Sequence, residues 1–200
     1  MVFSDRIIAG ISLFAAILVL VIGLNAAEQM YSGYSVSLNY ISDLGATCQG
    51  TSCKIIQPSA VIFNSSVVLS GILVSIAAYF LYREFRTIIV PIFLALSGIG
   101  AMGVGIFPEY AGQLHYVMAF ITFVFSGLSL IAAHTIAAGP FRYLSIFLGI
   151  FTLAALVLFL SGQHLGLGPG GMERMIFYPF VLGGMAFSGY LMNLGEDCPK

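Results

Sequence analysis

The sequence predicts an all-α integral membrane protein: one membrane domain, residues 1–200, folded as a bundle of six transmembrane helices. The first observation behind this prediction is composition. Of the residues, 60% are hydrophobic and only 8% are charged, about a third of the charged share in ordinary globular proteins. The second is that six apolar stretches come near or exceed the roughly 20 residues that cross the hydrocarbon of a bilayer. They lie at about residues 7–27, 58–82, 87–107, 113–138, 142–162 and 175–194.

The third observation is the distribution of Lys and Arg, which predicts an N-in, C-in orientation in the cell membrane. Loops on the cytoplasmic side carry an excess of these residues. With the N-terminus inside, only Lys54 and Arg174 fall on the outer side. The inner side then carries Arg6, Arg83, Arg86, Arg142 and Lys200. The net charge of −1 and the lack of a basic cluster also exclude nucleic acid as a partner.

The first apolar stretch has features of a signal peptide, since Arg6 precedes it and Ala26-Ala27 ends it. Its apolar run is longer than the roughly 7–15 residues of a signal core, so we expect it to be kept as a helix. The outer loop 28–57 follows, and in it Ile41 and Leu44 flank Asp43. This pattern indicates a segment that lies against the membrane rather than a fully solvated loop.

Two cysteines of this loop, Cys48 and Cys53 in "CQGTSC", are expected to form a disulfide. Disulfides persist on the oxidising side of a cell membrane. Two free thiols or a metal-binding pair are the alternatives. The third cysteine, Cys198, lies in the inner tail and is expected to be a free thiol.

The second and third stretches carry polar and small residues at depth. "FNSS" (Phe63–Ser66) falls about two turns inside the second helix, so Asn64, Ser65 and Ser66 need partners within the bundle. In the third, Ser97, Ala101 and Gly105 recur at every fourth residue, which favours close helix packing.

Pro108 predicts the end of the third helix, because it cannot donate the next helical hydrogen bond. The turn "EYAG" then places His115 in the first turn of the fourth helix, where it can approach Glu109. His134 follows 19 residues later, about 28 Å along a helix, and therefore belongs at the inner end.

Gly166, Gly168 and Gly171 between the last two helices spell G-x-G-x-x-G, but no strand precedes them, so a dinucleotide site is rejected. We expect a re-entrant loop here. Glu173 and Arg174 are then expected to open the sixth helix, where a carboxylate complements the helix dipole.

These assignments gather polar residues on one side of the membrane and predict an outward-facing, partly buried site. General acid–base chemistry would fall to the carboxylates and histidines, and Arg174 would hold a phosphate or carboxylate head group. Ser65 or Ser66 is a nucleophile candidate only if a histidine reaches it. A divalent metal on the same carboxylates and histidines is an alternative, although their spacing is nonlocal. The expected catalytic residues are Asp43, Glu109, His115, His164 and Glu173; the expected ligand-binding residues are Asn64, Ser65, Ser66 and Arg174.

Two functions of different classes fit these features. The first is a protein that binds or processes a lipid or small amphiphile at the outer leaflet, with membrane lipids as its partners. The second is a non-catalytic accessory subunit of a larger membrane complex, or a homo-oligomer, in which the polar residues only cap helices. A transporter is not favoured, because the chain lacks an inverted repeat and a charge near the bilayer midplane.

The order of motifs resembles the prokaryotic family of six-helix membrane proteins called domain of unknown function 998. The resemblance rests on "ISDLG" (Ile41–Gly45), "FNSS" (Phe63–Ser66), "GIFPE" (Gly105–Glu109) with His115, and "GMER" (Gly171–Arg174). That family is distantly similar in fold to the DRAM-like autophagy modulators. The resemblance implies a fold and a set of positions, and it supplies no reaction.

We predict that a membrane-impermeant thiol reagent applied to intact cells will label this protein only after treatment with a reductant. The reason is that Cys48 and Cys53 are expected to be bridged and extracytoplasmic. Labelling before reduction would contradict the disulfide. Failure to label after reduction would contradict the orientation.

Overall fold

The computed structural model describes residues 4–50, 52–85 and 87–193, so that Arg86, Cys198 and Lys200 lie outside the described residues. Six helices in this part of the chain are long and apolar enough to cross a membrane, which confirms the predicted fold class. They are α1 (Asp5–Met30), α2 (Ser59–Phe85), α3 (Ile89–Ile106), α4 (Gln113–Ala132), α5 (Gly139–Leu160) and α6 (Gly168–Asn193).

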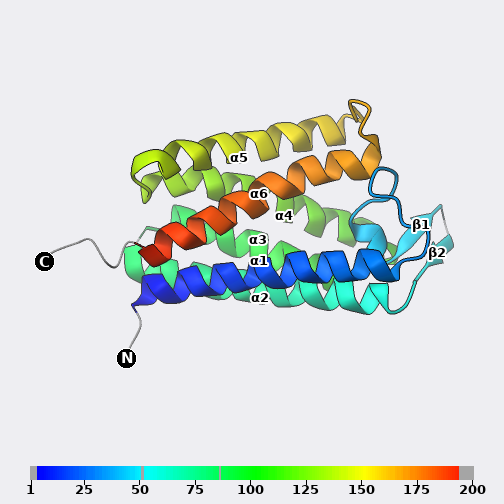
Figure 1. Cartoon of the computed structure of the whole chain (residues 1–200), viewed down its shortest axis with the longest axis horizontal. Helices are drawn as coiled ribbons and strands as arrows, with labels where there is room; N and C mark the ends of the chain where they lie inside the picture. The colour runs from blue at the N-terminus through cyan, green and yellow to red at the C-terminus, as the bar shows by residue number, and fades with distance from the viewer. Residues whose placement is uncertain (1–3, 51, 86, 194–200) are drawn as a thin grey trace, which may run out of the picture.

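The helices form an elongated antiparallel bundle (Figure 1). Each packs against the next one along the chain, and α6 returns to pack against α1, so the bundle is a closed ring. The start of α1 and the end of α6 lie at the same end of the bundle. Strands β1 (Thr47–Gln49) and β2 (Ser52–Lys54) lie at the opposite end. This arrangement places the start of α1 and the end of α6 on the same side of a membrane, while which side that is stays a prediction.

Segment 31–58, between α1 and α2, folds back onto the bundle. Ile41 and Leu44 are buried in the main hydrophobic core, with Leu44 in the short 3-10 helix η1 (Ser42–Leu44). Strands β1 and β2 then pair as an antiparallel hairpin in which Cys48 lies opposite Cys53. The two cysteines are joined in a disulfide, as predicted.

The predicted start of the sixth helix is wrong, because α6 begins at Gly168 rather than near residue 175. Gly168 has a φ of +77°, a conformation that glycine adopts readily, and Pro169 suits the first helical positions. The expected re-entrant loop is therefore a short turn. Glu173 lies in the second turn of α6, so it does not cap the helix as predicted.

Glycines allow close contact between α2 and α3. A methyl group at Gly71 on α2 would come within 2.5 Å of the Gly98 carbonyl oxygen and 2.8 Å of the Met102 amide nitrogen, both on α3. Because both atoms belong to backbone, neither helix can move aside locally. On the other face of α3, the Ser97 and Ser126 hydroxyls lie 2.6 Å apart and join α3 to α4. These contacts confirm the close packing predicted for the third helix.

We predict that Gly71→Ala will destabilise the protein by about 1–3 kcal/mol, the usual cost of overpacking a tight contact. Gly189→Ala is the matched control, because a methyl group there has no atom within 4 Å. The control should be neutral or slightly stabilising, since alanine favours a helix by about 0.5–1 kcal/mol over glycine. Thermal unfolding in mild detergent measures both, and equal effects would contradict the proposed α2–α3 contact.

Candidate functional site

A buried arginine fixes the position of the segment that follows α1. Arg174 on α6 is 2% exposed and forms an ion pair with Glu28 at the end of α1. Its guanidinium also donates to the Tyr34 hydroxyl at 2.8 Å and to the Val36 and Gly170 carbonyl oxygens, each at 3.1 Å. Arg174 therefore ties α1, the segment and α6 together, and these bonds occupy both of its terminal nitrogens.

The first turn of α6 contacts the same segment through backbone. The amide of Gly170 donates to the Ser37 carbonyl oxygen at 2.9 Å. A side chain at Gly170 would collide with the Asn39 carbonyl oxygen, so this position requires glycine. Sequence reasoning assigned these glycines to a loop, whereas they allow the segment to lie directly on the helix.

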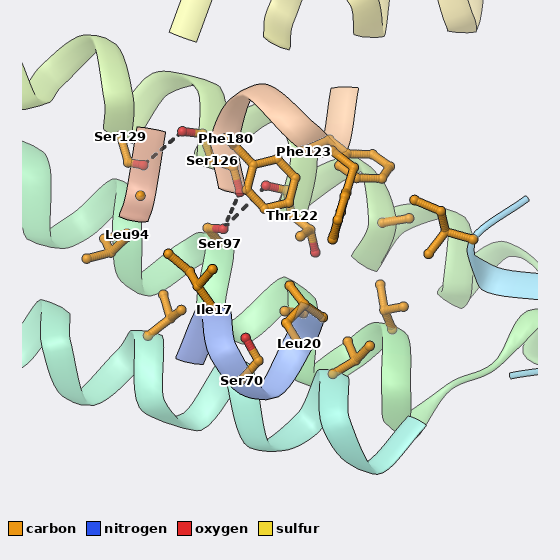
Figure 2. A pocket seen from close by; sticks show the side chains of 18 of the residues that line it. Ile17, Leu20, Ser70, Leu94, Ser97, Thr122, Phe123, Ser126, Ser129 and Phe180 are labelled. Carbon is orange, nitrogen blue, oxygen red and sulfur yellow. Dashed lines mark hydrogen bonds between the residues drawn. The ribbon is translucent and has the colours of Figure 1, made fainter. Parts of the chain in front are cut away.

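Beneath the segment is a polar chamber of about 440 Å³, at the end of the bundle that carries β1 and β2. A second, apolar cavity of about 120 Å³ lies deeper, among α1, α2, α3, α4 and α6 (Figure 2). The two share part of their walls. The residues that line both are Ser42, His115, Ala119, Phe123 and Glu173. The polar chamber thus adjoins a hydrocarbon-like cavity inside the bundle.

Four of the predicted catalytic residues line the polar chamber: Asp43, Glu109, His115 and Glu173. They come from four different elements, since Glu109 lies in the 3-10 helix η2 (Glu109–Ala111) and the others in η1, α4 and α6. None is more than 9% exposed. The tertiary fold has therefore gathered buried ionisable side chains that are up to 130 residues apart in the sequence.

The ring of His115 is oriented by backbone at the break predicted at Pro108. Its Nδ1 lies 2.8 Å from the carbonyl oxygen of Phe107, just beyond the end of α3. A carbonyl oxygen can only accept, so Nδ1 carries a proton. In the neutral ring Nε2 is then an acceptor, and no described residue donates to it.

Glu109 does not bond to His115, although sequence reasoning placed the two within reach of each other. One carboxylate oxygen accepts from the Ser42 hydroxyl at 2.7 Å, and the other accepts from the Cys48 amide at 3.2 Å. Glu109 thus connects η2 to the segment and the hairpin. Burial raises the pKa of this carboxyl, the bond from Ser42 lowers it, and the charge of Asp43 raises it further.

Asp43 is held by the segment itself. Its Oδ2 accepts from the Asn39 side-chain amide at 2.8 Å and from the Tyr40 backbone amide at 2.9 Å. Burial raises the pKa of the Asp43 carboxyl, and these two bonds partly offset the rise. Its Oδ1 has no hydrogen-bond partner among the described residues.

Glu173 accepts a hydrogen bond from the backbone amide of Ile41 through Oε2, while Oε1 has no hydrogen-bond partner in the described chain. Asp43 Oδ1, Glu173 Oε1 and His115 Nε2 are therefore three unpaired acceptors on residues that line one chamber. Such a set can bind hydrogen-bond donors and can take a proton from a ligand. The described residues hold no group of three His, Cys, Asp or Glu side chains placed to bind a metal ion.

The other predicted site residues lie outside both cavities. The Asn64 side-chain amide donates to the Gly45 carbonyl oxygen at 3.5 Å. Ser65 and Ser66 donate to carbonyl oxygens four residues earlier in α2, so neither hydroxyl is bonded to a histidine. His164 lies in the turn between α5 and α6. Ser42 was not predicted, although it lines both cavities, and its only sequence signal is its place beside Asp43.

We predict that the protein loses stability as pH rises from about 4, the ordinary carboxyl pKa, through the raised pKa values of Asp43 and Glu109. In this window the folded protein holds protons that the unfolded chain releases, so higher pH favours unfolding. Glu109→Gln should reduce this dependence on pH. Glu84→Gln should not, because Glu84 is an exposed residue in the last turn of α2. Melting temperatures measured across pH test this, and parallel curves for all three proteins would contradict it.

The family model for protein of unknown function DUF998 matches residues 14–188, which is most of the chain. No curated protein and no solved structure matches. The matched region contains all six helices in whole or in part and every residue that lines the polar chamber. The chain therefore belongs to the DUF998 family.

Proposed function

We propose that this protein binds an amphiphile with one hydrocarbon chain, its head group in the polar chamber and the first carbons of its chain in the apolar cavity. The observation that carries this proposal is the shared wall, where Ser42, His115 and Glu173 border both spaces. A molecule seated there would meet hydrogen-bonding groups on one side and hydrocarbon on the other. Binding pockets commonly combine an apolar lining with a few well-placed polar groups.

The apolar cavity has the lining that a hydrocarbon chain requires. Ile17, Leu20 and Phe180 contribute apolar side chains to it (Figure 2). Most of its hydroxyl groups are already bonded within the protein, as Ser97 is to Ser126 and Thr122 to a carbonyl oxygen of its own helix. A bound chain would therefore leave these polar groups satisfied, which avoids the main cost of burying them.

Under the predicted orientation the chamber faces the outside of the cell, and the amphiphile would come from the outer leaflet of the cell membrane. The chamber lies at the end of the bundle away from the termini, which supports this placement if the termini are cytoplasmic. His115 Nε2 would accept a hydrogen bond from the head group. The same nitrogen supplies a general base if the ligand is processed rather than only bound.

We predict that Ala119→Phe will abolish binding, because Ala119 borders both spaces and a phenyl ring would fill their junction. Val117→Phe is the matched control, since Val117 is 51% exposed on the lipid-facing side of the same helix. Native mass spectrometry of protein purified in mild detergent measures the bound amphiphile. The occupancy should fall about tenfold or more in Ala119→Phe and stay unchanged in the control.

Two histidine variants extend this test to the polar chamber. His115→Ala should lower the same occupancy while the protein stays folded. His134→Ala is the matched control and should not, although His134 Nδ1 also lies near a carbonyl oxygen, that of Ile131.

Loss of the bound amphiphile in both phenylalanine variants would contradict the proposed cavity. A protein that carries no amphiphile and purifies with a stoichiometric protein partner would instead favour an accessory subunit.

A further inference from the structure

The polar chamber contains three carboxyl groups, which carry negative charge when they are ionised, and no compensating cation among its described lining residues. Asp43, Glu109 and Glu173 line it, and no Lys or Arg does among the described residues. The nearest arginine in the sequence, Arg174, is paired with Glu28, which lies outside the lining. The two ion pairs of the described chain, at Arg174 and Arg83, leave all three chamber carboxylates unpaired.

The effect of this charge reaches a neighbouring tyrosine. Burial raises the pKa of the Tyr40 hydroxyl, and the negative charges of Glu173, Asp43 and Glu109 raise it further. Burying carboxylates without a counter-charge is costly, because water no longer stabilises them. A cation bound in the chamber would remove much of this cost.

Aromatic rings form a large part of the same lining. Tyr40 packs edge-to-face on Phe159 with the ring centroids 5.8 Å apart, and Tyr116 packs in the same manner beside His115. The faces of aromatic rings attract cations, and carboxylates with aromatic rings are the groups that bind ammonium ions in proteins. The aromatic residues of the lining are Tyr40, Tyr116, Phe120, Phe123 and Phe159.

The acceptors without a protein partner indicate the hydrogen-bonding character of a group that the chamber can bind. Glu173 is 6% exposed and His115 3%, yet Glu173 Oε1 and His115 Nε2 accept no bond from any described residue. With Asp43 Oδ1 they make three acceptors on residues of one chamber. A primary ammonium brings N–H donors and positive charge to such acceptors, whereas a phosphate offers mainly acceptors and adds negative charge.

We infer that the head group bound in the chamber is a primary ammonium, so that the ligand is a long-chain amine or an amphiphile that ends in one. This inference rests on the proposed function and names its ligand class. Arg174, which sequence reasoning assigned to an anionic head group, instead bonds Glu28, Tyr34 and the backbone. Anionic head groups would meet three carboxylates in the chamber and no free cation in its described lining.

The test uses three probes with the same tail: hexadecylamine, hexadecanol and hexadecyl phosphate. Each is added to the full-length protein in maltoside micelles at neutral pH, and occupancy is measured by native mass spectrometry and by the thermal shift. Hexadecylamine should bind about tenfold or more tightly than either of the others, from charge-assisted hydrogen bonds and contact with aromatic rings.

Charge-neutral variants assign the preference to the chamber. Glu173→Gln keeps an acceptor for the Ile41 amide and should reduce the preference for hexadecylamine over hexadecanol several-fold, while Glu84→Gln should leave it unchanged. Asp43→Asn provides the same comparison if Glu173→Gln fails to fold.

Each outcome separates this inference from the proposed function. Equal binding of the three probes, or preference for hexadecyl phosphate, would overturn the ammonium and leave the amphiphile site standing. No binding of any probe would overturn both. A preference that persists in the folded carboxylate variants would also overturn the ammonium site, because it would then arise from the micelle.

Discussion

The burial of Arg174 is the interaction on which the rest of the site depends. Arg174 is 2% exposed, and a guanidinium so buried in a membrane protein is tolerated only with hydrogen-bond partners. Its two terminal nitrogens find partners on α1, the following segment and α6 itself, while Nε has none among the described residues. Removing one partner of such a buried pair typically costs about 3–5 kcal/mol. The requirement to satisfy Arg174 therefore holds the segment in the position where it closes the polar chamber.

Small residues, rather than a buried charge, hold the interior of the bundle together. Glycines on α2 and α3 bring those helices into backbone contact, while serine and threonine hydroxyls bond within the bundle. Packing is close where these small residues meet, and the apolar cavity lies beside that contact among larger side chains. Small residues thus set the helix spacing, and the larger ones determine the space left between α1, α4 and α6.

The helices were predictable because hydropathy depends only on residues that are neighbours in the sequence. The break at Pro108 is also a local effect, and it placed His115 correctly in the first turn of α4. The partners were not predictable. His115 bonds a carbonyl oxygen instead of Glu109, and Glu109 bonds Ser42 and Cys48, which lie more than 60 residues away. The start of α6 was misjudged because Gly166, Gly168 and Gly171 favoured a loop. Gly168 and Gly170 instead open the helix, where contact with Ser37 and Asn39 requires glycine. Disulfide pairing was predictable, since the two cysteines lie in one short loop.

The two halves of the site follow from one difference between the adjacent residues Glu173 and Arg174. Both are buried in the second turn of α6, but Arg174 finds its counter-charge in Glu28, while Glu173 keeps one oxygen without a partner and borders both cavities. Pairing Glu173 within the protein would satisfy that oxygen and remove an acceptor from the chamber. A partly desolvated carboxylate oxygen without a protein partner is a cost to the fold that a bound cation can remove. The strength of such a ligand's binding would include that relief, so we expect the chamber to favour a cation over a neutral molecule of the same shape.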